Sequence, residues 1–167
     1  MPAQVIWKTP LGQVLARAHN SRLTALHFLD QDSPPEPATD AGETAAQQAA
    51  NDAVLALARQ QLDEYFARQR QDFSVPLHLA GTPFQETVWQ ALQTIPYGQT
   101  RSYQEQARQM HQASAIRAIA AANGRNPIAV LVPCHRVLGA GGKLTGYSGG
   151  LWRKQALLDL EQPGLFG

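Results

Sequence analysis

The single cysteine of this 167-residue chain stands among residues that could make it reactive. Cys134 follows the apolar run 128–132 and Pro133, and His135 and Arg136 come directly after it. The thiolate is the nucleophilic form of cysteine, and neighbouring basic groups favour it. Cys134 is therefore a candidate nucleophile, although a lone cysteine beside apolar residues is more often an inert core residue. One cysteine also excludes an internal disulfide and a multi-cysteine zinc site.

The residues before Cys134 predict a strand that ends close to it. Ile128 to Val132 are mostly branched and apolar, and Pro133 cannot donate a ladder hydrogen bond. Side chains placed just past a strand end often belong to a functional site. Adjacent side chains on an extended segment point to opposite faces, so His135 reaches the thiol only if the chain turns, or through a water.

Two short helices before this motif predict a helix-turn-helix. A separate helix is predicted before this pair. It begins at the cap Thr82, which is followed by a proline at the first helical position and a glutamine at the third. Ser102 repeats this capping pattern and begins a helix to about residue 110. Residues 111–114 are predicted to form a turn, and the second helix of the pair then runs to Asn123 and ends before Gly124.

The second helix of this pair has two different faces. Its buried face is predicted to hold Ile116, Ile119, Ala120 and Asn123. The outward face is predicted to hold Arg117, Ala118, Ala121 and Ala122, with Arg125 just beyond the helix end. Small residues bracketed by arginines would let a helix approach DNA closely. A solvated, alanine-rich surface helix is an equal alternative on this pattern alone.

The first half of the chain reads as an α/β scaffold. Strand-like runs at 5–7, 14–16 and 23–29 predict an antiparallel meander, and residues 30–40 predict a loop. A helix over about 43–70 would cover this sheet, and residues 75–79 could add an edge strand. The histidines at 19, 27 and 78 lack the spacing of metal ligands, so we expect no metal site.

The end of the chain combines a glycine-rich loop with a closing helix. Residues 146–150 form a loop without the glycine spacing of a nucleotide-binding fingerprint, so no cofactor is expected. Residues 151–160 predict a helix, and Glu161 follows it.

Composition and charge narrow the class of protein. The chain is 44% hydrophobic and 16% charged, which fits folded domains, and it shows no secretory signal or membrane-length apolar run. With its single cysteine, this predicts a cytoplasmic protein. The net charge of +1 is unevenly distributed. Residues 1–84 carry six Lys and Arg and nine Asp and Glu (6 − 9 = −3), whereas residues 85–167 carry eight and four (8 − 4 = +4). A basic second half suits contact with phosphates, although the excess is modest.

The motif 133–137, Pro-Cys-His-Arg-Val, resembles the active-site motif of the O6-alkylguanine-DNA alkyltransferases, also called methylated-DNA–protein-cysteine methyltransferases. The resemblance runs from about Gly81 to Glu161, through segments 81–85, 95–98, 102–103, 126–127 and 146–150. It implies an α/β domain over 1–80, with an antiparallel sheet plus a helix. A mainly α, helix-turn-helix domain of winged-helix type would follow over 81–167.

The resemblance also implies roles for individual residues. Cys134 would accept the alkyl group, His135 would act as its base through a water, and Glu161 would orient that histidine. Asn126 would fix the turn that carries the cysteine, and Tyr103 would help to rotate the nucleotide and bind guanine N3. Arg117 would fill the gap left in the base stack. The remaining implied contacts are to DNA (Ser102, Ala118, Ala121, Arg125) and to the substrate pocket (Ala129, Val130, Tyr147, Ser148).

The expected partner is double-stranded DNA carrying O6-alkylguanine, bound through the minor groove by a monomer; cooperative binding and reaction at O4-alkylthymine stay open. Ala120 departs from the glycine common in relatives, and the small Ala129 predicts a pocket that accepts groups larger than methyl. A cysteine hydrolase is one alternative, but the chain lacks a convincing oxyanion motif. A non-catalytic lesion-binding protein is another, and Cys134 argues against it.

Overall fold

The computed structural model describes residues 3–31 and 43–163. Backbone contacts divide the chain into two compact units, residues 1–79 and residues 80–167. Within the described ranges, no helix is both long and apolar enough to cross a membrane. The scaffold and reaction roles that the sequence assigns to the two halves stay predictions.

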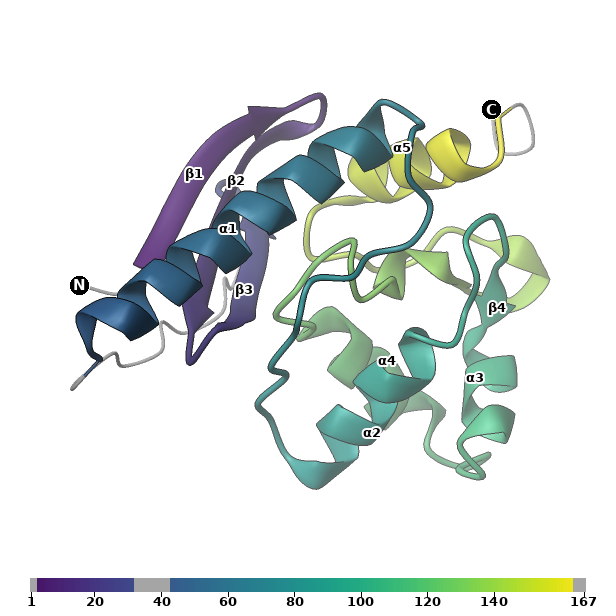
Figure 1. The fold of residues 1–167 in the computed structure, drawn as a ribbon. Helices are drawn as coiled ribbons and strands as arrows, with labels where there is room; N and C mark the ends of the chain where they lie inside the picture. Colours follow the sequence, from purple (N-terminus) through teal and green to yellow (C-terminus); the bar gives the residue numbers. More distant parts are fainter. Residues whose placement is uncertain (1–2, 32–42, 164–167) are drawn as a thin grey trace. The chain divides into compact units, whose positions relative to one another are not determined.

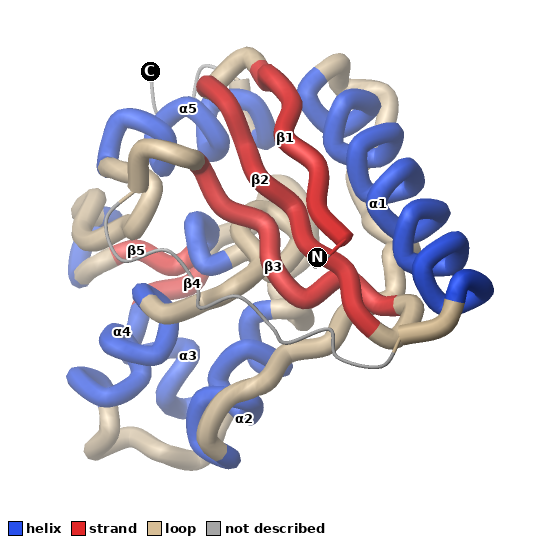
Figure 2. The backbone as a smooth tube through the Cα atoms, turned by 90° about the vertical axis from the view of Figure 1, so that its left-hand side faces the viewer, coloured by secondary structure: helices blue, strands red, loops and turns tan. Residues whose placement is uncertain are grey.

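The first unit is built on a three-stranded antiparallel sheet in the order β1-β2-β3 (Figure 2). The strands are β1 (Ala3–Thr9), β2 (Gly12–His19) and β3 (Arg22–Phe28). Asn20 and Ser21 join β2 to β3 with φ angles of 50° and 62°, as a tight two-residue hairpin requires. The predicted meander is therefore confirmed, whereas most of the predicted loop at 30–40 lies outside the described residues.

One long helix, α1 (Ala45–Phe66), packs along the three-stranded sheet (Figure 1). Thr44 and Gln47 form a reciprocal capping box, so the helix begins slightly later than predicted. It also ends earlier than predicted, at Phe66. Leu55, Leu62 and other apolar side chains on its inner face are buried. The predicted edge strand at 75–79 is wrong: only one parallel bridge joins Leu77 to Leu23 among the described residues.

The second unit is mainly helical and begins with α2 (Pro83–Leu92), β4 (Arg101–Ser102), α3 (Tyr103–Gln109) and α4 (Ile116–Gly124). Thr82 and Ser102 each complete a capping box, as the sequence predicts. Trp89 is a core residue whose Nε1 donates to Ala122 O on α4 at 2.8 Å. Gln106 on α3 and Asn123 on α4 exchange two buried amide hydrogen bonds of 3.0 and 2.9 Å.

The orientation of α4 differs in part from the prediction. Its buried residues are Ile119, Ala122 and Asn123, which share one face at spacings of three and four. Ala122 was predicted to face outward, but it packs toward α2, where its carbonyl meets Trp89. Ile116 was predicted to be buried and is 37% exposed, because it opens the first turn beyond that contact.

The chain then passes through the short 3₁₀ helix η1 (Cys134–Arg136) and β5 (Val137–Leu138), which pairs in parallel with β4. A second 3₁₀ helix, η2 (Ala140–Gly142), and a loop lead to α5 (Leu151–Glu161). The closing helix is confirmed, but two boundaries were wrong. Glu161 belongs to α5 instead of following it, and Gly124 lies inside α4 without a positive φ.

Candidate active site

The segment that leads to Cys134 is a series of tight turns, so the predicted strand at 128–132 is wrong. Leu131 N donates to Ala129 O at 2.8 Å around Val130, whose φ is 70°. Cys134 N then donates to Val132 O at 2.8 Å around Pro133, whose φ and ψ of −84° and 63° are those of an inverse γ-turn. A positive φ is rare for a β-branched residue and costs about 1–3 kcal/mol. Such strain is typical of functional sites.

Asn126 holds these turns together and reaches the thiol. Its Nδ2 donates to Val132 O at 2.7 Å and to Cys134 Sγ at 3.3 Å, while its Oδ1 accepts from Ile128 N at 3.0 Å. One buried amide therefore satisfies the turn on both sides and orients the sulfur. Donation to the sulfur also favours its ionised form.

A buried ionic network lies behind the cysteine. His135 Nε2 is 2.7 Å from Glu161 Oε2, and both side chains are essentially inaccessible. Arg136 binds both carboxylate oxygens, with Nε at 2.8 Å from Oε1 and Nη2 at 3.0 Å from Oε2. Arg136 Nη1 also donates to Ile95 O at 2.7 Å. Glu161, in the last turn of α5, therefore binds both His135 and Arg136. Its contact with Arg136 is a bidentate arginine–carboxylate pair.

The network shifts the pKa values of its own members. Burial alone would raise the pKa of Glu161, but His135 and Arg136 outweigh it and hold that pKa well below the usual range. Burial lowers the pKa of His135, although Glu161 opposes this shift. A carboxylate only accepts hydrogen bonds, so His135 carries its proton on Nε2. Its Nδ1, which has no partner among the described residues, is the ring atom able to accept a proton.

Cys134 opens into a cavity of about 470 Å³. The cavity is lined by α3, α4 and loop residues: Tyr103, Ala120, Asn123, Gly124, Thr145, Gly146, Tyr147 and Ser148. Burial raises the pKa of the Cys134 thiol, while the Asn126 hydrogen bond and the Lys154 charge lower it. Burial also raises the pKa of Tyr103, so its hydroxyl stays protonated and can donate. The cavity is large enough for an alkylated base.

The predicted pocket residues divide into two groups. Tyr147 and Ser148 line the cavity, and Ser148 Oγ donates to Gly124 O, which joins this loop to α4. Ala129 and Val130 are not among the residues that line the cavity. The prediction that Ala129 sets the pocket size therefore has no support in the geometry.

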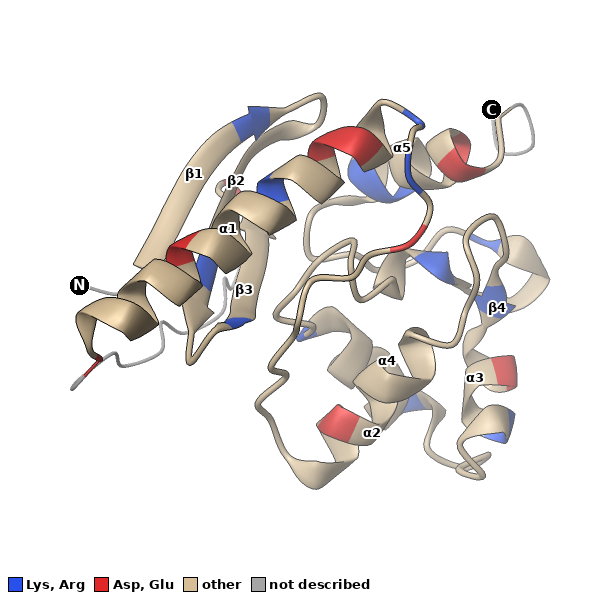
Figure 3. Cartoon of the chain, viewed as in Figure 1, with Lys and Arg blue, Asp and Glu red and all other residues tan. Residues whose placement is uncertain are grey.

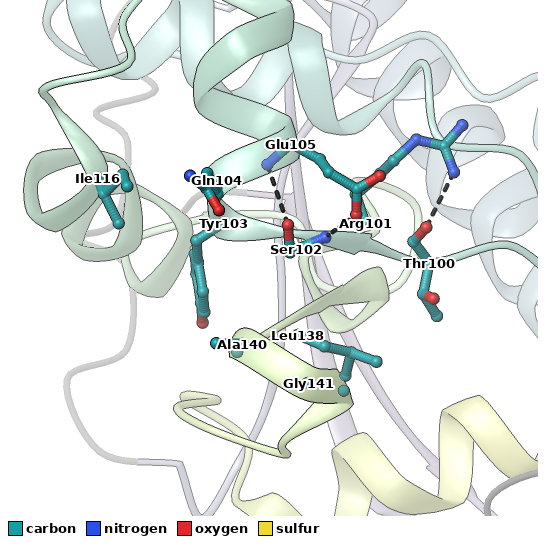
Figure 4. Close-up of a pocket in the computed structure, with 12 residues that line it drawn as sticks. Thr100, Arg101, Ser102, Tyr103, Gln104, Glu105, Ile116, Leu138, Ala140 and Gly141 are labelled. Carbon is teal, nitrogen blue, oxygen red and sulfur yellow. Dashed lines mark hydrogen bonds between the residues drawn. The ribbon is translucent and has the colours of Figure 1, made fainter.

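Four of the six predicted DNA contacts lie on the exposed face of α4 or just beyond its end, and the other two, Ser102 and Tyr103, are half-buried at the start of α3. Arg117, Ala118, Ala121 and Arg125 are all exposed. Ser102 and Tyr103 line a second, open hollow of about 680 Å³ between the start of α3 and η2. Figure 4 shows Tyr103 pointing toward Ala140 across this hollow. Tyr103 lines both hollows, so it stands between the exposed surface and Cys134.

Two buried cations of the site were missed by the sequence analysis. Arg136 was noted only as a neighbour of the cysteine, yet it is the bidentate partner of Glu161. Lys154, at 1% exposure, donates to Thr145 O and Gly146 O at the cavity wall. A signal was present for Lys154, because a lysine inside the apolar pattern of α5 must be buried or break that pattern. Within the described ranges, no three His, Cys, Asp or Glu residues form a possible metal site.

Comparison with known proteins agrees with this geometry. The model of the 6-O-methylguanine DNA methyltransferase DNA-binding domain matches residues 83–163, and that of its ribonuclease-like domain matches residues 5–79. The chain is 49% identical over 154 residues to the methylated-DNA–protein-cysteine methyltransferase of Mycobacterium leprae, covering 92% of this chain and 88% of that protein. It is 44% identical to the constitutive methylated-DNA–protein-cysteine methyltransferase of Bacillus subtilis, covering 93% and 92% of the two chains.

A solved structure extends the likeness to the fold. The Mycobacterium tuberculosis OGT protein, crystallised in complex with DNA, superimposes with a TM-score of 0.81 at 47% identity. The match covers 95% of this chain and 92% of that one. Both domains and the order of their elements are therefore shared, and this chain belongs to the 6-O-methylguanine DNA methyltransferase family.

Proposed function

We propose that this protein repairs DNA by direct reversal, transferring the alkyl group from O6 of an alkylated guanine to Sγ of Cys134. One observation carries the proposal: the only cysteine lies in a base-sized cavity, and the next residue belongs to a buried histidine–glutamate–arginine network. The same arrangement could serve O4-alkylthymine as a second substrate. Family membership supports the reaction type, and the geometry around Cys134 supports the proposed residue roles.

The lesion must leave the duplex before the sulfur can reach it, because O6 of guanine lies within the base stack. Arg117 is exposed on α4 and would enter the gap, while Ala118 and Ala121 let the helix press into the minor groove. Tyr103 would help to rotate the nucleotide toward the cavity that it lines. Ser102 and Arg125 would contact the backbone of the duplex.

The chemical step is a displacement at the alkyl carbon. The thiol proton passes through a water to His135 Nδ1, and the charged form of the imidazole is stabilised by Glu161. Cys134 Sγ forms a bond to the alkyl carbon as the bond from that carbon to guanine O6 breaks. Guanine departs as an anion, which the Tyr103 hydroxyl stabilises by donating a hydrogen bond to N3, and a solvent water then protonates the base. The Tyr147–Ser148 segment would hold the base in the cavity.

The product is a thioether, which has no easy leaving group. The side chains around Cys134 offer no route for its hydrolysis, so each molecule would react once. We expect a monomer that acts on double-stranded DNA in the cytoplasm, where a lone cysteine stays reduced. The reaction would consume the protein stoichiometrically.

The test is the intact mass of the protein after incubation with a duplex containing O6-methylguanine. We expect the mass of one added methyl group per molecule, mapped to Cys134 and absent from Cys134→Ala. Cys134→Ala should still bind the duplex, since the exposed face of α4 is unchanged. Repeated turnover on excess duplex, or binding without any mass change in the wild-type protein, would contradict the proposal.

A further inference from the structure

One buried cation beside the cavity has no part in the reaction described above. Lys154 lies in the first turn of α5 and is 1% exposed. Lysine is almost never fully buried without a compensating partner. Its Nζ donates to two successive carbonyl oxygens, Thr145 O at 2.6 Å and Gly146 O at 3.1 Å. Both carbonyls belong to residues that line the Cys134 cavity.

The charges of α5 are placed against the helix dipole. Arg153 and Lys154 stand in its first turn, and Asp159 and Glu161 stand in its last, which Figure 3 shows as separate blue and red segments. A helix dipole favours the opposite order, with anions at the start and cations at the end. Helix stability therefore does not explain this placement. Glu161 has its reason in the His135 and Arg136 network, and Lys154 requires a reason of its own.

The two carbonyls that Lys154 binds belong to the wall of the cavity that Cys134 also lines, so its ammonium is part of the surroundings of the thiol. Burial lowers the pKa of Lys154 to about 8, and a Cys134 thiolate raises it. In return, the charge of Lys154 lowers the pKa of Cys134 against the effect of burial. The Lys154 Nζ also stands 6.0 Å from the centre of the Tyr103 ring.

Other groups near the thiol do not supply this positive charge. His135 is neutral because burial lowers its pKa, and Arg136 is neutralised by Glu161 through two hydrogen bonds. Tyr103 and Tyr147 are held protonated because burial raises the pKa of each. Asn126 donates a neutral hydrogen bond. Arg153, the other buried cation in the first turn of α5, donates to Gly149 O and lies over the Trp152 ring. Among the described cations, Lys154 is the one whose charge lowers the pKa of Cys134.

We propose that Lys154 is a positioning residue for the alkyl transfer. Its ammonium holds the two carbonyls that place the cavity wall at residues 145–148, and its charge favours the thiolate of Cys134. This inference rests on the proposed function for its role in repair. Its effect on the thiol needs no DNA, so the two can be tested separately.

The first test follows the reaction of the lone cysteine with iodoacetamide between pH 6 and pH 10, by intact mass. Sulfur displaces iodide, and the thiol proton passes to the buffer. We expect Lys154→Met to move the midpoint of the rate profile upward by about one pH unit, which is a roughly tenfold slower reaction at neutral pH. Lys154→Arg keeps the charge and should recover part of the rate. Lys143→Met removes the same charge from an exposed site and should leave the profile unchanged.

A profile for Lys154→Met that superimposes on the wild type would overturn the proposal, as would an equal shift in Lys143→Met. Transfer of methyl from O6-methylguanine duplex is measured on the same proteins and should fall in Lys154→Met at least as much as the iodoacetamide rate. If the wild-type protein transfers no methyl group, the proposed function fails, whereas the iodoacetamide profile still decides the effect of Lys154 on the thiol.

A second measurement covers the case in which Lys154→Met does not fold. The titration of Lys154 Nζ is followed by NMR in the wild type and in Cys134→Ser, whose hydroxyl does not ionise in this range. Coupling is reciprocal, so the pKa of Lys154 should fall when the thiolate is removed. An unchanged titration would overturn the proposal, and Lys143 in the same spectra is the internal control.

Discussion

The two units of this protein keep different kinds of residues out of water. Among the described residues of the first unit, the buried ones are apolar apart from Thr9, His27, Asn51 and Gln61. In the second unit, the buried set includes four charged residues, which are Arg136, Arg153, Lys154 and Glu161, and also His135. Burying a charge is costly unless it is paired and hydrogen-bonded. The second unit therefore carries an electrostatic cost that the described part of the first unit avoids.

This difference coincides with the position of the candidate active site. His135, Arg136 and Glu161 form one network next to Cys134, Lys154 binds the cavity wall, and Val130, with its strained φ, lies in a turn four residues before the cysteine. The sheet and α1 of the first unit instead follow the simple rule of an apolar interior under an amphipathic helix. Substitutions in either unit test this difference in buried residues.

The largest effect is expected from Glu161→Gln. This change keeps the shape of the side chain but leaves Arg136 charged and unpaired in the interior. We expect the free energy of unfolding to fall by about 3–5 kcal/mol, measured by urea denaturation. A double variant, Arg136→Met with Glu161→Leu, should recover much of this loss without recovering alkyl transfer. A stability cost below 1 kcal/mol for the single variant would show that the buried pair is not structurally important.

A comparable but smaller loss is expected from an apolar change in the first unit. Leu62 on α1 is 1% exposed against the sheet, so Leu62→Ala removes buried apolar area and leaves a cavity. We expect a loss of about 2–4 kcal/mol in urea denaturation, with Leu62→Met costing under about 1.5 kcal/mol. The rate of alkyl transfer by the folded protein should stay at the wild-type value. A slower transfer would show that the first unit affects the chemistry as well as the stability.

The same contrast explains how much the sequence could predict. The three strands, α1 and the capping boxes at Thr82 and Ser102 follow from local patterns, and all of them form. The strand predicted over 128–132 does not form, although the branched residues of this run favour a strand. Hydrogen bonds from Asn126 stabilise turns there, and no local propensity reports a side chain that binds a backbone carbonyl six residues away.

The site residues divide in the same way. Cys134, His135 and Asn126 stand close together in the chain, so their sequence motif could identify them. Glu161 was known only through the family resemblance, because 26 residues separate it from His135. Lys154 was missed, since its importance comes from burial, which depends on how α5 packs.

The pH dependence of alkyl transfer tests the protonation states of the second unit. Burial lowers the pKa of His135 below its ordinary value of 6.5, so the ring stays neutral at that pH. The rate should therefore hold between pH 8 and 6.5 and fall only at lower pH, by up to about tenfold per unit once the ring is protonated. Single-turnover rates on an O6-methylguanine duplex give this profile. A fall that is half complete at pH 7 or above would mean that the pKa of His135 is raised instead.

The smallest expected effect comes from a neutral contact in the core of the second unit. Trp89→Phe removes the hydrogen bond from Nε1 to Ala122 O but keeps an aromatic ring between α2 and α4. Ala122 O also accepts from Arg125 N at 3.1 Å, so it does not lose every partner. We therefore expect a loss of only about 1–2 kcal/mol in urea denaturation. The iodoacetamide rate of Cys134 should be unchanged, since none of the groups that act on the thiol moves. A loss above about 3 kcal/mol would mean that Trp89 also fixes the orientation of α4, and a matching loss of DNA affinity would then locate that effect at Arg117.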